Sequence, residues 1–196
     1  MRKLTAVESV TLDGVMQAPG GVDEDTRGGF AHGGWAAPYH DAVMGEAMGR
    51  RMARGGGGPL VFGRRTYEQF AGYWPHQPDD NPYGAQLNRV EKLVASTTLR
   101  DPLPWQRSRV LPGDAADAVA ALKAEDGPDI GVLGSGVLVQ ALLARGLVDA
   151  FLLLVHPLVL GSGRRLFPDG GAPATLELED SLTTTTGVVI ATYRCR

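Results

Sequence analysis

Two arginines directly follow an apolar segment in the stretch LVFGRRTYEQF, residues 60–70. The apolar run predicts a short strand that ends at Gly63, and the residues after it predict the first turn of a helix. Arg64 and Arg65 would then face the positive end of the helix dipole, which is unfavourable for the helix alone. A bound anion would offset that cost, because helix N-termini and guanidinium groups both bind phosphate. A solvated arginine pair beside an ordinary turn explains this stretch equally well.

Two later segments also combine glycines with a chain reversal. VLGSGVLVQAL places Gly134 and Gly136 between a predicted strand and a predicted helix, an arrangement typical of pyrophosphate-binding turns. The dinucleotide fingerprint is incomplete, because Val139 stands where its third glycine would be. The segment 160–171, LGSGRRLFPDGG, is interpreted mainly as a structural surface loop. Two strand-to-helix turns of this type, one of them with arginines, favour a bound nucleotide.

Asp41 is a candidate for proton chemistry, because it begins a predicted helix shortly after Trp35 and Pro38. An aspartate at a helix start usually caps the helix. If the same carboxyl group lies in a pocket, desolvation raises its pKa and lets it transfer a proton. Both interpretations remain open. No metal site is expected, since the four histidines lack a metal-ligating spacing.

Composition limits the function classes. The chain has 196 residues, enough for one domain, and its net charge of −3 gives no general attraction to nucleic acid or to an anionic membrane. A disulfide framework is excluded because Cys195 is the single cysteine. We expect a cytoplasmic location, because no stretch is apolar enough to span a membrane and Glu8 interrupts any signal-peptide core.

The hydrophobic pattern alternates between strands and helices, which predicts an α/β fold with a mostly parallel sheet. The last segment, 175–196, predicts two antiparallel strands at the sheet edge. Long loops are expected at 14–39 and 73–86. Strands are predicted at 3–12, 59–63, 92–97, 129–133 and 149–160, and helices at 40–53, 65–72, 114–126 and 137–146. The first of these helices has an apolar stripe of Val43, Ala47, Met48 and Met52, and the glycines at 55–58 end it.

The segments TLDG, VFGRRTYE, KLVAST and VLGSGVLVQALLARGLVDAFLLLVHPLVLGSGRRLF occur in this order. Together they resemble the dihydrofolate reductase-like superfamily, and more closely the reductase domain of riboflavin biosynthesis, the RibD C-terminal type. The resemblance implies a single domain over residues 1–196, with a mixed eight-stranded sheet between two layers of helices. It also implies NADPH as the cofactor and a small molecule as the substrate.

The resemblance assigns roles to individual residues. Arg64 is expected at the 2′-phosphate of NADPH, and the loop 14–39 is expected to close over the nicotinamide. The positions that match the family's cofactor-binding segments are Gly63, Arg64, Arg65 and Thr66 at the phosphate turn, Ser96 and Thr97 beside the adenosine, and Leu133, Gly134, Ser135, Gly136, Val137 and Leu138 at the pyrophosphate turn. The expected catalytic positions are Asp41, which would orient the substrate or relay a proton, and Trp35, which would form a wall of the site.

Two departures from the family pattern are visible. The family often joins two glycines by a cis peptide in the later turn, and here the pair is Gly134–Ser135, so a cis bond at this position is a hypothesis. The zinc signature of the deaminase half is absent, so a role in riboflavin synthesis does not follow.

The leading hypothesis is an NADPH-dependent reductase that transfers hydride to a C=N or C=O group of a small heterocyclic substrate of pteridine, pyrimidine or ribityl type. The alternatives are a true dihydrofolate reductase and a nucleotide-binding module without turnover. The resemblance weakly favours a homodimer, and no nucleic-acid or membrane partner is expected.

Overall fold

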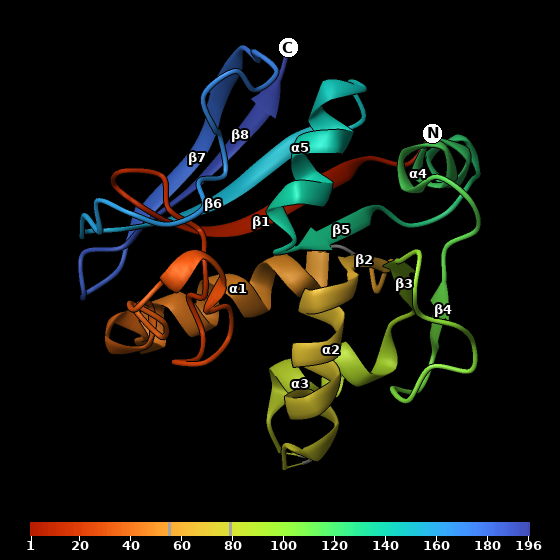
Figure 1. The fold of residues 1–196 in the computed structure, drawn as a ribbon, viewed down its shortest axis with the longest axis horizontal. Coiled ribbons are helices and arrows are strands. Elements are labelled where there is room, and N and C mark those ends of the chain that lie inside the picture. Colours follow the sequence, from red (N-terminus) through yellow and green to blue (C-terminus); the bar gives the residue numbers. More distant parts are fainter. Residues whose placement is uncertain (55, 79) are drawn as a thin grey trace.

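The computed structural model describes residues 1–54, 56–78 and 80–196. Eight strands form one sheet in the order β4-β3-β2-β5-β1-β6-β8-β7 (Figure 1). The pairs from β4 to β6 are parallel, whereas β8 is antiparallel to both β6 and β7. This confirms the predicted sheet with an antiparallel C-terminal edge. The strands are β1 (Leu4–Thr11), β2 (Leu60–Gly63), β3 (Lys92–Ala95), β4 (Ser108–Val110), β5 (Ile130–Leu133), β6 (Ala150–His156), β7 (Leu176–Thr183) and β8 (Val189–Cys195).

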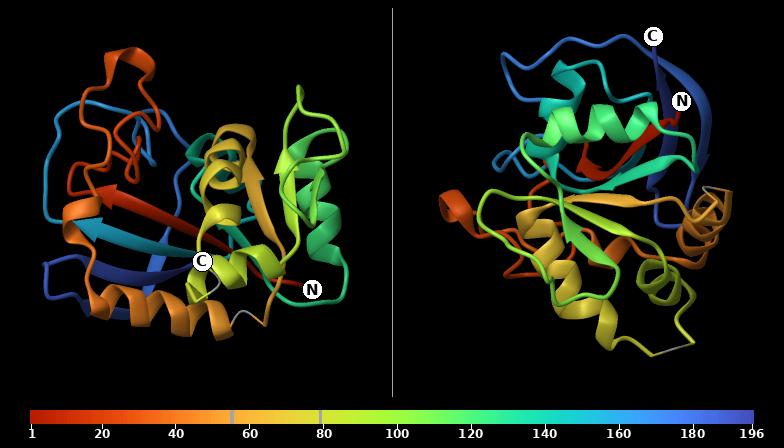
Figure 2. Two further views of the ribbon diagram at one scale, coloured as in Figure 1. Left: turned by 90° about the horizontal axis from the view of Figure 1, so that it is seen from below. Right: turned by 90° about the vertical axis from the view of Figure 1, so that its right-hand side faces the viewer.

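Helices cover both faces of this sheet, which gives three layers (Figure 2). On one face, Val119 of α4 and Leu142 of α5 share a core with Leu4 of β1. The other face is covered by α1, α2 and α3, whose buried side chains pack on β6, β2 and β3. The helices are α1 (Ala42–Arg54), α2 (Arg64–Tyr73), α3 (Pro82–Arg89), α4 (Ala115–Ala124) and α5 (Gly136–Ala144), with short 3₁₀ turns at Arg27–Gly29, Ala37–Tyr39 and Trp74–His76.

The predicted strand at 149–160 forms β6, which is covered on both sides. Phe151 and Leu153 belong to the core under α4 and α5, while Leu152 and Leu154 belong to the core under α1. Side chains alternate between the two faces of a strand, so a continuous apolar run is required where both faces are buried.

The segment 73–86 was predicted as a loop, and this is wrong in its second half. It contains the start of α3, where the side chain of Asn81 accepts hydrogen bonds from the backbone N–H groups of Tyr83 and Gly84. Pro82 occupies the first helical position, where its missing N–H costs nothing. Asn followed by Pro is therefore a helix start, and the Pro-rich composition concealed it.

Two smaller expectations also change. The short edge strand β4 was not predicted, because three residues with an exposed centre carry almost no hydrophobic pattern. On α1 the buried positions are Met44 and Ala47, and Val43 is only half-buried. The side chain of Met52, the glycine at 55 and Asp79 lie outside the described residues. Among the described residues, no helix combines the length and apolar character that a membrane crossing requires.

Candidate functional site

The two predicted phosphate turns lie side by side at the carboxyl ends of β2 and β5. These strands pair in parallel, so the turns that follow them meet at one edge of the sheet. Ser135 joins them directly, because its Oγ accepts a hydrogen bond from the Gly63 N–H at 2.8 Å and donates to Thr66 Oγ1 at 2.8 Å. Residues separated by about 70 positions in the sequence thus form one structure.

The turn before α5 is made by two consecutive left-handed residues, Gly134 with φ 55° and Ser135 with φ 68°. Glycine adopts this conformation without strain, whereas serine does so less readily. In the part of the chain that the structure describes, the one cis peptide is Asp101–Pro102, so the hypothesis of a cis Gly134–Ser135 bond is wrong. The left-handed pair produces the tight reversal with a trans bond.

The first turn of α5 leaves the backbone N–H groups of Gly136 and Val137 without a hydrogen-bond partner among the described residues, whereas the Leu138 N–H donates to the Ser135 carbonyl. Ser135 precedes the helix, but its side chain makes no cap hydrogen bond to the first turn, because Oγ is already used by Gly63 and Thr66. The unpaired amides of a first helical turn and the helix dipole both attract anions. The geometry of the turn is therefore compatible with a phosphate group.

A cavity of about 1710 Å³ opens in front of both turns. Pockets for one small ligand usually measure about 300–1,000 Å³, so this cavity has room for more than one. The predicted residues Ser96 and Thr97 are not part of its lining, although Ala95, directly before them, is. The predicted cofactor residues that line it are Gly63, Arg64, Arg65, Thr66, Leu133, Gly134, Ser135, Gly136, Val137 and Leu138.

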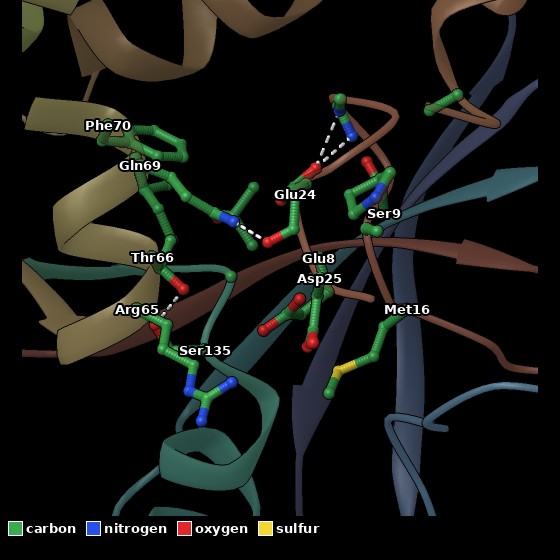
Figure 3. A pocket seen from close by; sticks show the side chains of 18 of the residues that line it. Glu8, Ser9, Met16, Glu24, Asp25, Arg65, Thr66, Gln69, Phe70 and Ser135 are labelled. Atoms are coloured by element: carbon green, nitrogen blue, oxygen red, sulfur yellow. Dashed lines mark hydrogen bonds between the residues drawn. The ribbon is translucent and has the colours of Figure 1, made fainter. Parts of the chain in front are cut away.

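The two arginines of the first turn differ in their contacts. Arg64 forms an ion pair with Glu68, one helical turn later, at 2.9 Å. Arg65 is exposed and has no ion pair among the residues described, and Figure 3 shows it beside Thr66 and Ser135. An exposed pair of the Arg64–Glu68 type contributes about 0.3–0.5 kcal/mol, so it does not prevent Arg64 from binding a phosphate.

The segment 160–171, interpreted above as structural, also contributes to the cavity. Leu166 is buried, as a structural loop that anchors itself in the core requires, but Phe167 is exposed, and Arg164 lies on the cavity lining. Gln17 holds this segment in place, because its Oε1 accepts from the Arg164 N–H at 2.9 Å and its Nε2 donates to two backbone carbonyls of the loop 14–39. The sequence gives little sign of this arginine's position, because it has no helix or strand pattern around it.

Trp35 does not form a wall of the cavity, contrary to the expectation. It is 7% exposed and packs inside the loop 14–39 against Val15 and Phe30. Its Nε1 donates to the Gln17 carbonyl at 2.7 Å, and its ring meets the His156 ring edge-on at 5.0 Å. Trp35 therefore supports the loop from within, which suits a large apolar side chain with one polar atom.

Asp41 lies at the cavity edge, but it acts as a helix cap. Its carboxylate accepts from the Met44 N–H at 2.8 Å and from the N–H and hydroxyl of Thr185, and it also contacts the Thr186 N–H. The Thr185 hydroxyl, followed by the Met44 N–H, lowers the pKa of Asp41 below its usual value. The carboxyl group is hydrogen-bonded rather than desolvated, in agreement with the capping interpretation, and its role in orienting the substrate stays a prediction.

The carboxyl group that is desolvated is Glu8 of β1, which was not proposed as a site residue. Glu8 is 4% exposed, lines the cavity, and its Oε1 is buried without a hydrogen-bond partner among the described residues. Burial raises the pKa of Glu8 to about 8. A charged residue at an inward position of an alternating strand was the available signal, since Leu4, Ala6 and Val10 occupy the same face.

The loop 14–39 is fastened across the cavity at its tip. The carbonyl of Glu24 accepts a short hydrogen bond from Gln69 Nε2 of α2 (Figure 3). Within the loop, Asp25 forms an ion pair with Arg27. The side-chain hydrogen bond from Arg27 lowers the pKa of Asp25. The loop therefore brings an ionised carboxylate to the cavity in which Glu8 is kept protonated.

A comparison with protein families identifies the chain. Residues 2–190 match the family model described as the RibD C-terminal domain. The chain belongs to the RibD C-terminal domain family. The uncharacterized protein YyaP of Bacillus subtilis (strain 168) is 28% identical over 137 residues, which cover 68% of this chain and 72% of that protein.

Solved structures show that this RibD C-terminal domain has the dihydrofolate reductase-like fold. A putative riboflavin biosynthesis protein from Shewanella sp. PV-4 superimposes with a TM-score of 0.67 at 19% identity, covering 99% of both chains. A pyrimidine reductase-like protein from Corynebacterium diphtheriae gives 0.65 at 15% identity, covering 100% of this chain and 92% of the other. Dihydrofolate reductase from Enterococcus faecalis, complexed with NADP(H), gives 0.60 at 13% identity, covering 99% and 96%.

Proposed function

We propose that this RibD C-terminal domain is an NADPH-dependent reductase that transfers hydride to a C=N or C=O group of a small heterocyclic substrate. The observation that carries the proposal is the contact of the two glycine turns through Ser135, on a cavity of about 1710 Å³. A dinucleotide needs anion-binding groups at several points together with space for a second ligand. Family membership supports a reductase of this general type.

The residues present fit a phosphorylated cofactor. Arg64 and Arg65 offer guanidinium groups at the start of α2, and the first turn of α5 offers backbone N–H groups beside them. We assign Arg64 to the 2′-phosphate and Ser96 and Thr97, which follow β3, to the adenosine. When bound, NADPH supplies the hydride, while the protein binds, orients and excludes water.

The substrate class is proposed from the cavity and the relatives. A pteridine, a pyrimidine or a ribityl-bearing heterocycle matches a site that combines apolar walls such as Leu133 and Leu154 with polar groups such as Ser9 and Gln17. Two structural relatives are named as a putative riboflavin biosynthesis protein and a pyrimidine reductase-like protein. Dihydrofolate is the comparison substrate, because it separates a true dihydrofolate reductase from the other members of this class.

The test is a titration with NADPH and NADH followed by tryptophan fluorescence, on the wild type and on Arg64→Ala. We expect tighter binding of NADPH, and a rise of about 10- to 100-fold in its Kd for Arg64→Ala, because a charge-assisted hydrogen bond contributes about 1.5–3 kcal/mol. The Kd for NADH should change little, since NADH lacks the 2′-phosphate.

The matched control is Arg50→Ala, which removes an arginine from an exposed ion pair of the same helical spacing on α1. Its affinity for NADPH should equal that of the wild type. Equal losses for NADPH and NADH in Arg64→Ala would refute the 2′-phosphate role, and failure of the wild type to bind either cofactor would refute the reductase.

A further inference from the structure

Glu8 is the one side chain of β1 that brings an ionisable group into the cavity. Its neighbours along the inward face are apolar, and the cavity-lining residues beside it, Val7 and Ser9, point to the opposite face of the strand. The carboxyl group is buried and its Oε1 has no partner in the described part of the protein. A buried polar group without a partner costs about 1–3 kcal/mol, so a structural reason for a glutamate here is missing.

The position of Glu8 relative to the cofactor turn is fixed by the sheet register. Val7 pairs with Leu133, the last residue of β5, and the Val7 carbonyl accepts from the Gly134 N–H at 3.1 Å. Glu8 is therefore the next residue of β1 beyond the point where β5 leaves the sheet. Figure 3 shows Glu8 at the centre of the cavity, with Met16 on one side and Ser135 on the other.

The charged groups around Glu8 leave its carboxyl group without a cation. On β6 the partner of Glu8 is the apolar Leu153, β5 ends one residue before it, and the turn before α5 carries no charge. The titratable and charged side chains that line the cavity from other elements are Asp23, Glu24, Asp25 and Arg27 of the loop 14–39, His40 and Asp41 before α1, Arg64, Arg65, Glu68 and Tyr73 of α2, Tyr83 of α3, and Arg164. Among them, Asp25 is paired with Arg27 and Arg64 with Glu68. Desolvation alone accounts for the protonated state of Glu8, because no ionic partner contributes.

We propose that Glu8 is the proton donor of the reduction, and that it protonates the nitrogen or oxygen of the substrate's C=N or C=O group. This inference rests on the proposed reductase function. Glu8 is suited to the role because it is a carboxylic acid, unpaired, sheltered from bulk water and open to the cavity beside the cofactor turn. General acids act best when they are protonated at the working pH and release the proton readily.

Atoms and electrons balance in this step. The O–H bond of the Glu8 carboxyl group breaks, and an N–H or O–H bond forms at the substrate heteroatom. The adjacent carbon of the substrate gains a hydride from the dihydronicotinamide, which is oxidised as the substrate is reduced. The Glu8 carboxylate then takes a proton from water that enters the cavity once the product has left.

The first experiment measures the protonation of Glu8 without any turnover. Infrared difference spectra of the wild type and Glu8→Gln, recorded across a pH series, isolate the carboxylic-acid C=O band of this residue. We expect the band to be present at pH 7, to vanish in Glu8→Gln and to remain in Glu46→Gln, an exposed glutamate of α1. Absence of the band at pH 7 in the wild type would overturn the proposal.

The second experiment compares two hydride acceptors with NADPH as the reductant. 7,8-Dihydropterin needs a proton at nitrogen, whereas an N-methylquinolinium cation accepts a hydride without one. We expect Glu8→Gln to slow reduction of 7,8-dihydropterin about 10²-fold or more, the usual size of a general-acid effect, and to leave reduction of the cation within about threefold. Glu46→Gln should match the wild type with both acceptors.

The outcomes separate the two hypotheses. Equal slowing with both acceptors would assign Glu8 a structural or cofactor-orienting role and overturn the proton donor. Unchanged reduction of 7,8-dihydropterin in Glu8→Gln would do the same, while the reductase itself would stand. A wild-type protein that reduces neither acceptor and does not bind NADPH would overturn the reductase, and the role of Glu8 with it.

Discussion

At the scale of single residues, the desolvated carboxyl group is not the one that the sequence suggested. Asp41 was a candidate for proton transfer because of its place after a long loop, but its four hydrogen-bond donors stabilise the ionised form. Glu8 is held in the acid form by burial. The chemistry of a carboxyl group depends on the groups that surround it in space, and neither set of neighbours is adjacent in the sequence.

The pH dependence of stability provides a separate prediction for Glu8. Its pKa is about 8 in the folded protein and 4.5 in a solvated, unfolded chain, so the folded protein holds this proton over the interval between the two values. The stabilisation is complete below pH 4.5 and is lost as the pH rises through about 8, by at most about 5 kcal/mol. Urea unfolding of the wild type and Glu8→Gln from pH 5 to 9 should show Glu8→Gln gaining relative stability as the pH rises.

His156 also contributes to the pH dependence of stability, with the opposite sign. Burial lowers its pKa, so it disfavours folding as the pH falls below its usual value. The residue is present in both proteins, so its effect cancels when the two curves are subtracted. Parallel curves for the wild type and Glu8→Gln would contradict a buried acid at position 8.

The turn before α2, which carries Arg64 and Arg65, could be predicted from the sequence. Gly63, Arg64 and Thr66 stand together in the chain, and their unusual combination at a helix start is apparent from the order of the residues alone. Ser135 could be predicted as part of a second turn, but its contacts with Gly63 and Thr66 could not, because they depend on β2 and β5 being neighbours.

At the scale of elements, the strands and helices with strong periodicity were predictable, and those without it were not. The helix predicted from Asp114 begins there, because Asp114 caps α4 and accepts from the N–H groups of Ala116 and Asp117. Gly146, the last residue of the predicted helix 137–146, has φ 64° two residues after the end of α5, where a left-handed glycine commonly ends a helix. In contrast, α3 is short and has few apolar residues, so it has almost no hydrophobic periodicity. Its N-cap, Asn81, was the stronger sequence signal for this helix.

The cap of α3 leads to a stability prediction. Asn81→Ala removes both hydrogen bonds to the first turn and should lower the free energy of unfolding by about 1 kcal/mol. Asn81→Ser is the control, since serine is a comparably good cap and should retain most of that stability. Urea denaturation measures both. A loss in Asn81→Ser as large as that in Asn81→Ala would assign the effect to contacts other than capping.

At the scale of the whole molecule, one sheet carries three of the four hydrophobic clusters, and the fourth lies within the loop 14–39 and the segment after β6. The order of the strands in the sheet differs from their order in the sequence, and the first strand, β1, lies between β5 and β6. Removal of any central strand would expose clusters on both faces. We therefore propose that residues 1–196 unfold as a single cooperative domain.

Tryptophan positions make this proposal measurable. Trp35 lies in the loop cluster, whereas Trp74 and Trp105 belong to the cluster around β2, β3, α2 and α3. Fluorescence and far-ultraviolet circular dichroism should give coincident urea transitions, because a two-state domain loses all its structure together. Separate transitions, or a fluorescence change in Trp35→Phe that precedes the loss of ellipticity, would contradict a single unit.

The homodimer stays a prediction, and the sheet edge limits how it can form. Glu177, Glu179 and Asp180 of the edge strand β7 are engaged with Arg194, Arg196 and Arg51. Charged side chains on an edge strand oppose pairing with another strand. We therefore expect a homodimer to form through surfaces other than the exposed edge of β7.

The place of β1 in the sheet also has a consequence in time, during synthesis of the chain. Both neighbours of β1 are made late, because Leu4 pairs with Ile130 and Thr5 with Ala150. About 120 residues separate the end of β1 from β5, and at ~5–20 residues per second a ribosome needs roughly 6–24 s to add them. During that interval β2 and β3 can already pair, because a far shorter connection joins them. The strand β1, which carries Glu8, has neither of its neighbouring strands available during this time.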